Sequence, residues 1–293
     1  MIYRFSVGRL ECVVVSDGQP QPPWEPPLDQ YFTPEAGVPE DELQAAATDE
    51  GRSTLTCGYN CLFIKTSDGL AVVDTGLGAS FLGYGEYIEP LVGKLEGGMA
   101  GAGFSRGDLA AVVFTHLHQD HARGATWSGE VRFPAATAYA HASEVAFWSE
   151  PLELPSALPH VDAARAAIRE FGAKLQPFEH GAELLPGVHA VAATGHTPGH
   201  TALLLKSGEE QLLCVGDTFY DPLQLTHPNW ATPWDLDRSS SIASRRRILE
   251  WAADERLLLH AYHLPFPGLG RVSRNGTSFT WQPVDRTEQV RRG

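Results

Sequence analysis

The chain has 293 residues, of which 43% are hydrophobic and 20% charged, and these proportions are typical of a globular protein with a sizeable core. The formal net charge of −14 argues against a nucleic-acid partner, because proteins that bind phosphate backbones concentrate lysine and arginine. The chain has no apolar run of membrane-spanning length, and its N-terminus has no signal-peptide features. We therefore predict a cytoplasmic protein without a membrane partner.

The first half of the chain begins with strands. Residues 2–16 alternate loosely between apolar and polar side chains and predict strands at a sheet edge. The proline-rich stretch 19–39 excludes a regular helix, and its aromatic residues are Trp24, Tyr31 and Phe32. This stretch is either a surface loop fastened by its rings or an arm that covers a pocket. Residues 60–65 and 70–73 predict a hairpin whose second strand ends in Asp74.

The remaining elements predict an α/β domain. A weak helical pattern covers 87–96, and a glycine-rich link (Gly97, Gly98, Gly101, Gly103) leads to a buried strand at 112–114. Further helices are expected at 142–149, 162–171 (between Asp162 and Gly172) and 239–253, and strands at 138–140, 188–193, 201–206, 211–216 and 257–259. Asn275-Gly276 predicts a hairpin, and 219–237 is a second proline- and aromatic-rich stretch. Since no segment resembles a flexible linker, we predict one domain over residues 1–293.

The four cysteines form no CxxC motif, so the sequence contains neither a zinc ribbon nor a thioredoxin-type motif. Cys12 and Cys214 lie in apolar runs and are interpreted as small buried side chains. Cys57 and Cys61 could approach each other across a bend, but reduced thiols are expected in a cytosolic protein.

The stretch Thr115-His116-Leu117-His118-Gln119-Asp120-His121 follows a buried strand and carries three imidazoles and a carboxylate. Histidine and aspartate are ligands of zinc and related metals. His116 and His118, two apart on an extended segment, point to the same side and can bind one ion. Asp120 and His121, at the turn, can point at a second ion. A polar loop that happens to contain histidines is a much weaker explanation of this spacing.

Three later segments can complete the metal shell, because each places a polar residue on a turn after an apolar run. They are residues 194–200 with His196 and His200, 215–217 with Asp217, and 262–265 with His263. A catalytic metal needs three or four protein ligands and an open position. Strand ends at one edge of a sheet could bring these residues to the first cluster.

With these residues the sequence resembles the metallo-β-lactamase superfamily. The matching motifs are Asp74 in VVDTG, the HLHQDH stretch, His196 in GHTPGH, Asp217 in VGDT and His263 in AYHLPFPG, and they span residues 60 to 270 in the family's order. The resemblance implies a four-layer αβ/βα sandwich with a dinuclear site at the edge of two facing sheets.

The resemblance also implies a ligand set of five histidines and two aspartates. His116, His118 and His196 would bind one metal, Asp120, His121 and His263 the other, and Asp217 would bridge both. Asp74 would lie behind the site and hold a ligand imidazole in one tautomer. By its position His200 is expected beside the ligands rather than among them. The remaining histidines (His141, His160, His180, His189, His227, His260) are assigned to the surface or the core.

Two divalent ions per chain are expected, zinc in the first place, with manganese, cobalt or iron as alternatives that accept the same ligands. A pair of metal ions would share a water and lower its pKa to about 7, giving a bridging hydroxide that attacks a carbonyl or phosphoryl centre. Asp217 would hold the two ions, and Asp120 would orient the hydroxide or relay a proton. We therefore predict a metal-dependent hydrolase with Asp120 and Asp217 in catalytic roles.

The substrate is expected to be a small molecule. The closing phrase HLPFPGLG resembles the branch that contains methyl parathion hydrolase and N-acyl-homoserine lactonases. Trp24, Phe219, Trp230 and Trp234 could surround an apolar pocket, or could equally pack loops or a subunit interface. An apolar pocket would suit a lactone or ester, and incidentally a phosphotriester. A glutathione thioester, as in glyoxalase II-like relatives, would suit it less because lysine is scarce.

Two alternatives remain open beside the hydrolase. One is a mononuclear iron dioxygenase of sulfur compounds with the same fold, which the full seven-ligand set disfavours. The other is a non-enzymatic metal-binding protein, from which loss of ligands would be expected. The arm at 19–39 could also pair two subunits in a homodimer.

Overall fold

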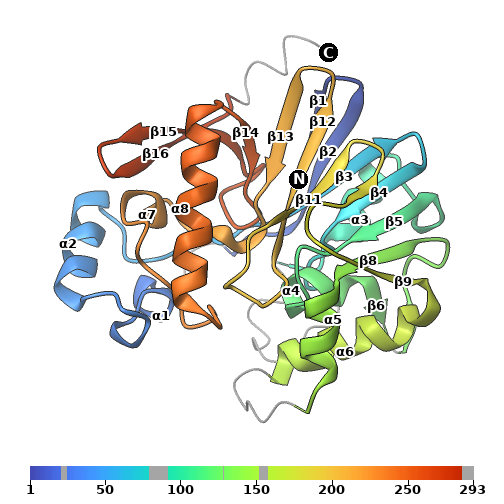
Figure 1. Ribbon diagram of the computed structural model, residues 1–293, viewed down its shortest axis with the longest axis horizontal. Helices are drawn as coiled ribbons and strands as arrows, with labels where there is room; N and C mark the ends of the chain where they lie inside the picture. The colour runs from blue at the N-terminus through green and yellow to red at the C-terminus, as the bar shows by residue number, and fades with distance from the viewer. Residues whose placement is uncertain (21–24, 79–91, 128, 152–157, 286–293) are drawn as a thin grey trace.

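The computed structural model describes residues 1–20, 25–78, 92–127, 129–151 and 158–285 (Figure 1). Its first sheet has the strand order β1-β2-β3-β4-β5-β8-β9. Strands β1 to β4 are mutually antiparallel, and β4, β5, β8 and β9 run parallel. The strands are β1 (Ile2–Val7), β2 (Leu10–Gly18), β3 (Tyr59–Thr66), β4 (Gly69–Val73), β5 (Leu109–Val113), β8 (Thr137–His141) and β9 (Leu175–Phe178).

The second sheet has the order β10-β11-β12-β13-β14-β15-β16 and is antiparallel except for the pair β13 and β14. Its strands are β10 (Glu183–Leu185), β11 (Val188–Ala192), β12 (Thr201–Ser207), β13 (Glu210–Cys214), β14 (Leu258–His260), β15 (Leu269–Asn275) and β16 (Ser278–Pro283). A separate short ribbon joins β6 (Thr126–Trp127) to β7 (Glu130–Val131). The hairpin predicted at Asn275-Gly276 is confirmed, because Asn275 pairs with Ser278.

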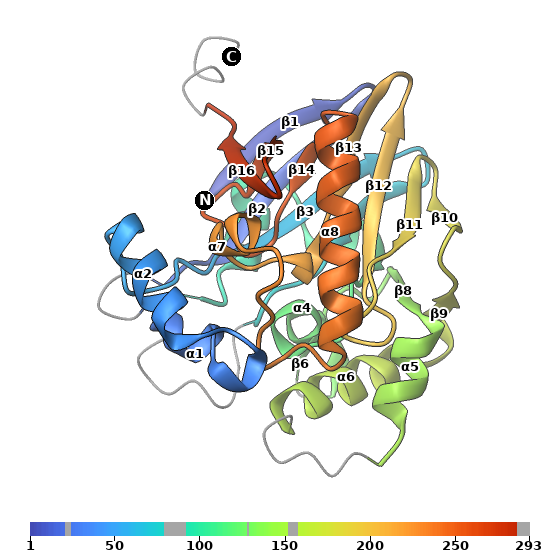
Figure 2. The same cartoon turned by 60° about the vertical axis from the view of Figure 1, so that its left-hand side comes forward.

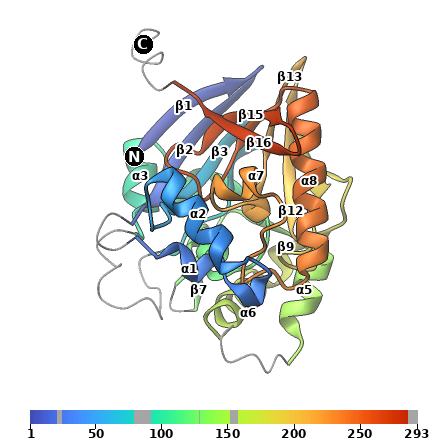
Figure 3. The ribbon, with the colours of Figure 1, turned by 90° about the vertical axis from the view of Figure 1, so that its left-hand side faces the viewer.

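The two sheets face each other and are covered by helices on their outer faces. Helices α3 (Leu95–Gly101), α5 (Ala142–Ser149) and α6 (Leu158–Phe171) pack on the first sheet, and α7 (Leu223–Thr226) and α8 (Arg238–Asp254) on the second. Figures 1 and 2 show α8 and α6 on opposite sides of the sheets. Helices α1 (Leu28–Tyr31) and α2 (Glu40–Glu50) lie beside α7 (Figure 3). This arrangement confirms the predicted αβ/βα layers.

Strand alternation explains why both faces of each sheet are buried. Along β2, Val13 and Val15 pack toward the helices of the first layer, whereas Cys12 and Val14 enter the core between the sheets. Since successive strand side chains point to opposite faces, a continuous apolar run supplies two cores at once. In β12, Leu203 packs between the sheets in the same way.

Several sequence-based element boundaries were wrong. Residues 97–101, predicted as a glycine-rich link, belong to α3, while residues 92–94 of the predicted helix are not helical and residues 87–91 lie outside the described residues. Helix α6 begins four residues before Asp162. The structure also contains α2, β9, β10 and α7, which the sequence analysis did not identify.

All four cysteines are buried and free, as expected for reduced thiols. Among the described residues, no helix is long and apolar enough to cross a membrane.

Candidate metal centre

The loop after β5 carries the first set of candidate ligands. β5 ends at Val113, and after a bend at Thr115 the chain reaches His118, which is extended and precedes the short helix α4 (Gln119–Ala122). His116 and His118 precede α4 and His121 lies within it. All three side chains are buried, so the loop presents its imidazoles to the interior of the molecule rather than to solvent.

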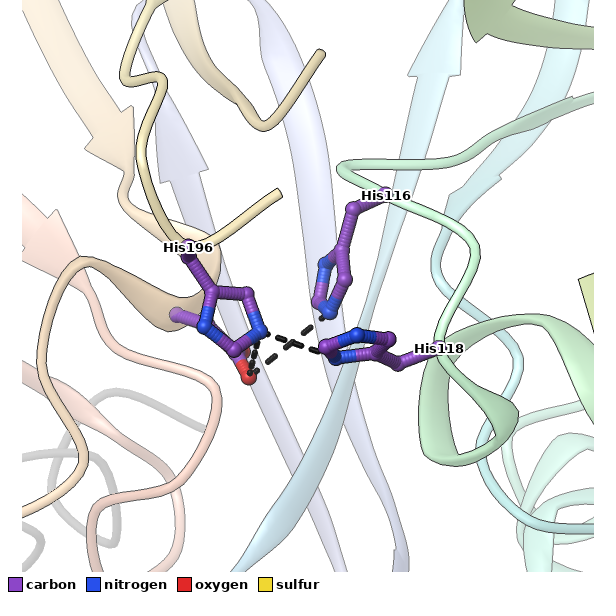
Figure 4. Close-up of side chains that lie close together, drawn as sticks. His116, His118 and His196 are labelled. Atoms are coloured by element: carbon purple, nitrogen blue, oxygen red, sulfur yellow. Dashed lines mark hydrogen bonds and ion pairs between the residues drawn. The ribbon is translucent and has the colours of Figure 1, made fainter. Parts of the chain in front are cut away.

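Three other loops bring the remaining candidates to the same place. His196 lies in the turn between β11 and β12, Asp217 follows β13, and His263 follows β14. Gly195 permits the approach of His196 because a side-chain carbon at this position would lie 2.0 Å from the backbone nitrogen of Ser241 in α8. Figure 4 shows His196 pointing toward His116 and His118 from the opposite side of the site.

The seven candidates form two adjacent groups. His116, His118, His196 and Asp217 make the first group, and Asp120, His121 and His263 the second; within each, the ligand atoms lie within 4.8 Å of one another. Asp217 connects the groups, because its Oδ2 lies 3.4 Å from His196 Nε2 and 3.2 Å from His263 Nε2. Its Oδ1 lies 3.1 Å from His121 Nε2.

The donor atoms fit a pair of divalent cations. Nε2 of His116, Nε2 of His121 and Oδ1 of Asp217 are buried and form no hydrogen bond with the described residues. Buried polar atoms without partners are costly, and here they all point into one space. A set of five imidazoles and two carboxylates supplies the ligands that zinc, manganese, cobalt and iron accept.

Asp74 holds His121 from behind. Its Oδ2 lies 2.8 Å from Nδ1 of His121 and accepts a hydrogen bond from the Thr115 hydroxyl, while its Oδ1 accepts from the Thr115 backbone N–H. Because Nδ1 of His121 donates to this carboxylate, Nε2 is the nitrogen that can face a metal. Asp74 adopts a positive φ of 55°, which turns the chain sharply as it leaves β4.

Asp235 has the same relation to His196 and was missed by the sequence analysis. Its Oδ1 lies 3.1 Å from Nδ1 of His196 and accepts from the Ser241 hydroxyl, and its Oδ2 accepts from the Thr232 backbone N–H. The segment 219–237 has no strand pattern that would have pointed to this carboxylate. Nδ1 of His263 lies 3.0 Å from the carbonyl oxygen of Gly58, which fixes that ring as well.

His200 lies outside both groups and supports the loop of Asp217. Its Nδ1 donates to the carbonyl oxygen of Ala193 at 2.8 Å, and its Nε2 accepts from the Asp217 backbone N–H at 2.9 Å. Burial lowers the pKa of His200 to about 3, so the ring is neutral and keeps its acceptor.

The charges within the site differ between the two groups. Burial holds the pKa of His116 and of His118 well below the usual range. For His121, burial acts in the same direction, but Asp217, Asp74 and Asp120 outweigh it and raise the pKa to about 10. Burial would raise the pKa of Asp217, yet the surrounding histidines hold it well below its usual range. A metal bound at Nε2 of His121 would therefore displace a proton.

Tyr220 contributes a phenol at the edge of the site. Its hydroxyl lies 3.3 Å from both ring nitrogens of His196, and its ring stacks on His263 with centroids 4.9 Å apart. Burial and the nearby Asp217 raise its pKa well above the usual value, so the hydroxyl stays protonated. Tyr31 and Trp234 pack beside it, with ring centroids 4.5 Å apart. The sequence analysis had not assigned Tyr220.

The four aromatic residues proposed to line a pocket have different positions. Trp24 lies outside the described residues. Phe219 follows the packing alternative, because its ring is fully buried in the core of the second sheet beside Trp281. Trp230 is also buried, stacked on His227. Of the three that the structure describes, Trp234 alone is half-buried, and it lies next to Tyr220 with ring centroids 6.3 Å apart.

His160, which the sequence analysis assigned to the surface or the core, and Glu144, which it did not identify, both touch the site region. The ring of His160 lies 4.2 Å from that of His118, and burial lowers its pKa. Glu144, buried in α5, accepts from the backbone N–H groups of Leu117 and Gly199, and therefore ties together two loops that carry candidate ligands. No local pattern marks either residue, because their roles depend on how α5 and α6 pack.

The model of the metallo-beta-lactamase superfamily matches residues 55–263, which is most of the chain. The chain belongs to the metallo-β-lactamase superfamily. An N-acyl homoserine lactonase from Bacillus sp. is 25% identical over 189 residues, covering 60% of this chain and 70% of the relative. The lactonase AiiA of Bacillus thuringiensis subsp. kurstaki is 24% identical over 220 residues, covering 69% and 80%.

Among solved structures, the dizinc quorum-quenching lactonase AidC, in complex with a product, aligns with a TM-score of 0.86 and 26% identity over 97% of both chains. The hydrolase AbOPH aligns with a TM-score of 0.83 and 23% identity, again over 97% of both chains, and shows the same fold. The fold, the family and the two groups of metal-binding side chains together make this superfamily member a metal-dependent, lactonase-like hydrolase.

Proposed function

We propose that the protein uses two divalent metal ions, zinc in the first place, to hydrolyse a lactone or ester that carries an apolar substituent. The observation that carries this proposal is the position of Asp217, whose two carboxylate oxygens face ligands of both groups. The lactonases among its relatives support the same substrate class. A mononuclear iron dioxygenase would leave Asp120, His121 and His263 without a role.

His116, His118 and His196 would hold one ion, Asp120, His121 and His263 the other, and Asp217 both. When bound, such a pair of ions lowers the pKa of a shared water and polarises the substrate carbonyl. Asp74 and Asp235 keep His121 and His196 in the tautomers that leave Nε2 free to coordinate. The pair of carboxylates behind the ligands therefore prepares the site before the metals arrive.

Asp120 is the carboxylate placed to move a proton. Its side chain is 17% exposed, whereas that of Asp217 is 2% exposed, so Asp120 faces the open side of the site. Its Oδ2 would accept the proton released when the nucleophilic water attacks, and would return it to the leaving alkoxide oxygen. Tyr220 would donate its phenolic hydrogen to an oxygen of the substrate, because its hydroxyl remains protonated at the edge of the site.

The apolar substituent would lie against the rings of Tyr31 and Trp234. Both are half-buried, and Tyr31 also packs against Tyr220 with ring centroids 5.9 Å apart. Aromatic walls with one exposed face suit an acyl or aryl group next to the reacting ester. The N-terminal arm then takes part in substrate binding rather than only covering the surface.

A screen of the zinc-loaded protein tests the proposal. Homoserine lactones of increasing acyl length, simple lactones, aryl esters, an aryl phosphotriester and a glutathione thioester are compared, with His116→Ala as the inactive control. We expect lactones to give the highest kcat/KM and longer acyl chains to improve it. Oxygen uptake with one iron per chain, or turnover of the thioester alone, would contradict the proposal.

A further inference from the structure

Helix α8 carries a fully buried arginine, Arg245, that the proposed reaction does not use. A guanidinium group keeps its charge in proteins, and burying that charge is costly unless acceptors and a counter-charge surround it. Leucine, isoleucine and alanine side chains of the same helix form part of the core of the second sheet. The contacts of Arg245 therefore indicate why a charge is kept in this interior.

The guanidinium group binds the segment that follows Asp217. Its Nε donates to the carbonyl oxygen of Thr218 at 2.7 Å, and its Nη1 donates to the carbonyl oxygens of Trp230 at 2.6 Å and Pro228 at 3.2 Å. Thr218 directly follows Asp217, whose carboxylate connects the two groups of candidate ligands. One side chain therefore fixes three carbonyl groups of an irregular segment that begins at a candidate ligand.

The third nitrogen of Arg245 faces the carboxylate behind His196. Nη2 lies 3.8 Å from Oδ2 of Asp235 and forms no hydrogen bond with the described residues. Asp235 is buried as well, and its Oδ1 lies 3.1 Å from Nδ1 of His196. Ser241, one turn before Arg245, donates its hydroxyl to the same Oδ1. Since residues four apart lie on one helix face, α8 presents both groups to Asp235.

We propose that Arg245 is a positioning residue for the metal centre, which fixes His196 through Asp235 and Asp217 through the Thr218 carbonyl. It acts on two of the four residues in the first group, and it reaches the second group only through Asp217. This inference rests on the proposed two-ion site. Without the guanidinium group, Asp235 loses the positive charge beside it and the carbonyl of Thr218 loses a donor, so neither ligand is held in place.

The geometry requires an arginine rather than any cation. A guanidinium group has donors on three nitrogens in one plane, so it can bind Thr218 and Trp230 while it faces Asp235. The ammonium group of a lysine carries the same charge at a single point and cannot span these three positions. Arg245→Lys therefore keeps the charge and loses the links to the segment, whereas Arg245→Met loses both.

Chelator competition on the zinc-loaded protein would measure the two metal-binding steps, and His196→Ala identifies the step of the first group. We expect Arg245→Met to weaken this step about 10- to 100-fold and Arg245→Lys to weaken it less. The other step should change less than the first in both variants. The visible spectrum of the protein loaded with Co²⁺ depends on coordination geometry and should change in the same two variants.

Two further variants of α8 separate positioning from stability. Leu249→Ala removes a buried side chain one turn after Arg245, so it should lower the melting temperature and leave both metal-binding steps as in the wild type. Arg246→Met removes a hydrogen bond to Asn229 on the exposed side of the same segment and should change neither step. If Arg245→Met does not fold, Arg245→Lys is compared with Leu249→Ala by the same measurements.

The results distinguish this inference from the proposed function. Equal weakening of both steps in the Arg245 variants overturns the positioning role, and so does a lower melting temperature with both steps and the Co²⁺ spectrum unchanged. Either result leaves the proposed function intact. If the wild type binds fewer than two zinc ions, the proposed two-ion site fails, and the role of Arg245 fails with it.

Discussion

The candidate ligand imidazoles of His121 and His196 are each fixed by a second hydrogen bond at Nδ1, and this determines which nitrogen can face a metal. Asp74 accepts from Nδ1 of His121 and Asp235 from Nδ1 of His196. Both carboxylates are also held by backbone or hydroxyl donors, so they cannot turn away without breaking several hydrogen bonds. Asp74 holds a residue of one group of candidate ligands and Asp235 holds a residue of the other group, so the two carboxylates can be tested separately.

We expect Asp74→Asn to weaken the group containing His121, and Asp235→Asn the group containing His196. In each variant the amide can present N–H to the imidazole, which favours the wrong tautomer and should reduce metal affinity about 10- to 100-fold. Competition with a chromophoric chelator would measure the two binding steps separately. Loss of the same step in both variants would contradict the assignment of the two groups.

The sequence identified the site residues that belong to a local pattern and missed those that lie in an irregular segment. His116, His118 and Asp120 stand in one local pattern after a buried strand, and the later candidates each follow an apolar run. Tyr220 and Asp235, in contrast, lie in an irregular segment with no periodic signal. Their relation to His196 arises only when α8 packs against that segment, so no local rule could have identified them.

At the scale of elements, α3 shows how packing overrides composition. The segment 97–103 contains four glycines, which favour a loop by propensity. Yet a side-chain carbon on Gly98 would lie 2.3 Å from Cγ1 of Val15 in β2, so glycine lets the helix approach the sheet closely. Leu95 and Met99 are buried on the same side. Gly98 therefore marks a close contact between helix and sheet, whereas Gly97 and Gly103 have no neighbour within 4 Å of a side-chain carbon.

Glu144 connects α5 to two loops of the metal centre. Its carboxylate accepts from Leu117 N–H, from Gly199 N–H and from the Trp148 indole N–H. In Glu144→Gln one acceptor oxygen becomes an N–H donor that faces another donor. We expect about 1–3 kcal/mol lower stability and weaker metal binding at His116, His118 and His196.

Thermal unfolding of the metal-free protein and chelator competition would measure both effects of Glu144→Gln. The matched control is Glu150→Gln at the exposed end of α5, which should change neither quantity. A lower melting temperature with unchanged metal affinity would mean that Glu144 supports α5 but not the site.

The segment after α2 pairs with the N-terminal arm, because the Leu28 backbone N–H donates to the Ser53 carbonyl, and an ion pair joins this segment to the loop of Tyr220. Nη1 of Arg52 donates to Oδ2 of Asp221 at 2.8 Å, and Nη2 donates to Oδ1. Asp221 is buried and also accepts from the Leu223 backbone N–H, whereas Arg52 is 25% exposed. Asp221 follows Tyr220 directly, so this pair links the arm to the phenol of the site.

We expect Arg52→Met to destabilise the protein by about 1–3 kcal/mol, less than for a fully buried pair because Arg52 is partly solvated. It should also reduce the preference for long acyl chains, since Tyr31 would lose its fixed position beside Trp234. Urea unfolding and the chain-length series would measure the two effects. Arg274→Met, which breaks an exposed pair with Asp254, is the control and should change neither.

At the scale of the whole molecule, the general fold was easier to predict than the number of its elements. Long apolar runs ending in turns indicated the central strands, because burial on both faces leaves a strong signal. The short edge strands β9 and β10 and the four-residue helix α7 contain too few residues for a periodic pattern. Asp17, for example, is buried and accepts from backbone N–H groups of Leu77, Gly93 and Leu95, a contact that only the folded chain defines.

Acid stability of the whole fold should depend on a histidine away from the metal groups. His260 in β14 is fully buried in the second sheet, and burial lowers its pKa from 6.5 to about 3. The unfolded chain binds a proton near pH 6.5 and the folded chain only near pH 3. Above pH 6.5 the protonation of His260 therefore does not affect the free energy of unfolding. As the pH falls from 6.5 toward 3, the free energy of unfolding decreases by about 1.4 kcal/mol per pH unit because of this residue.

Urea unfolding of the metal-free protein between pH 7.5 and 4 would measure this slope in the wild type and in His260→Phe. Phenylalanine occupies a similar volume and cannot be protonated. The free energy of unfolding of the variant should therefore fall less steeply with decreasing pH, by the amount that corresponds to one bound proton. Nε2 of His260 is buried without a hydrogen bond to the described residues, and the substitution removes the contact of Nδ1 with Sγ of Cys214 at 3.2 Å. Equal slopes in both proteins would show that acid unfolding is governed by other groups.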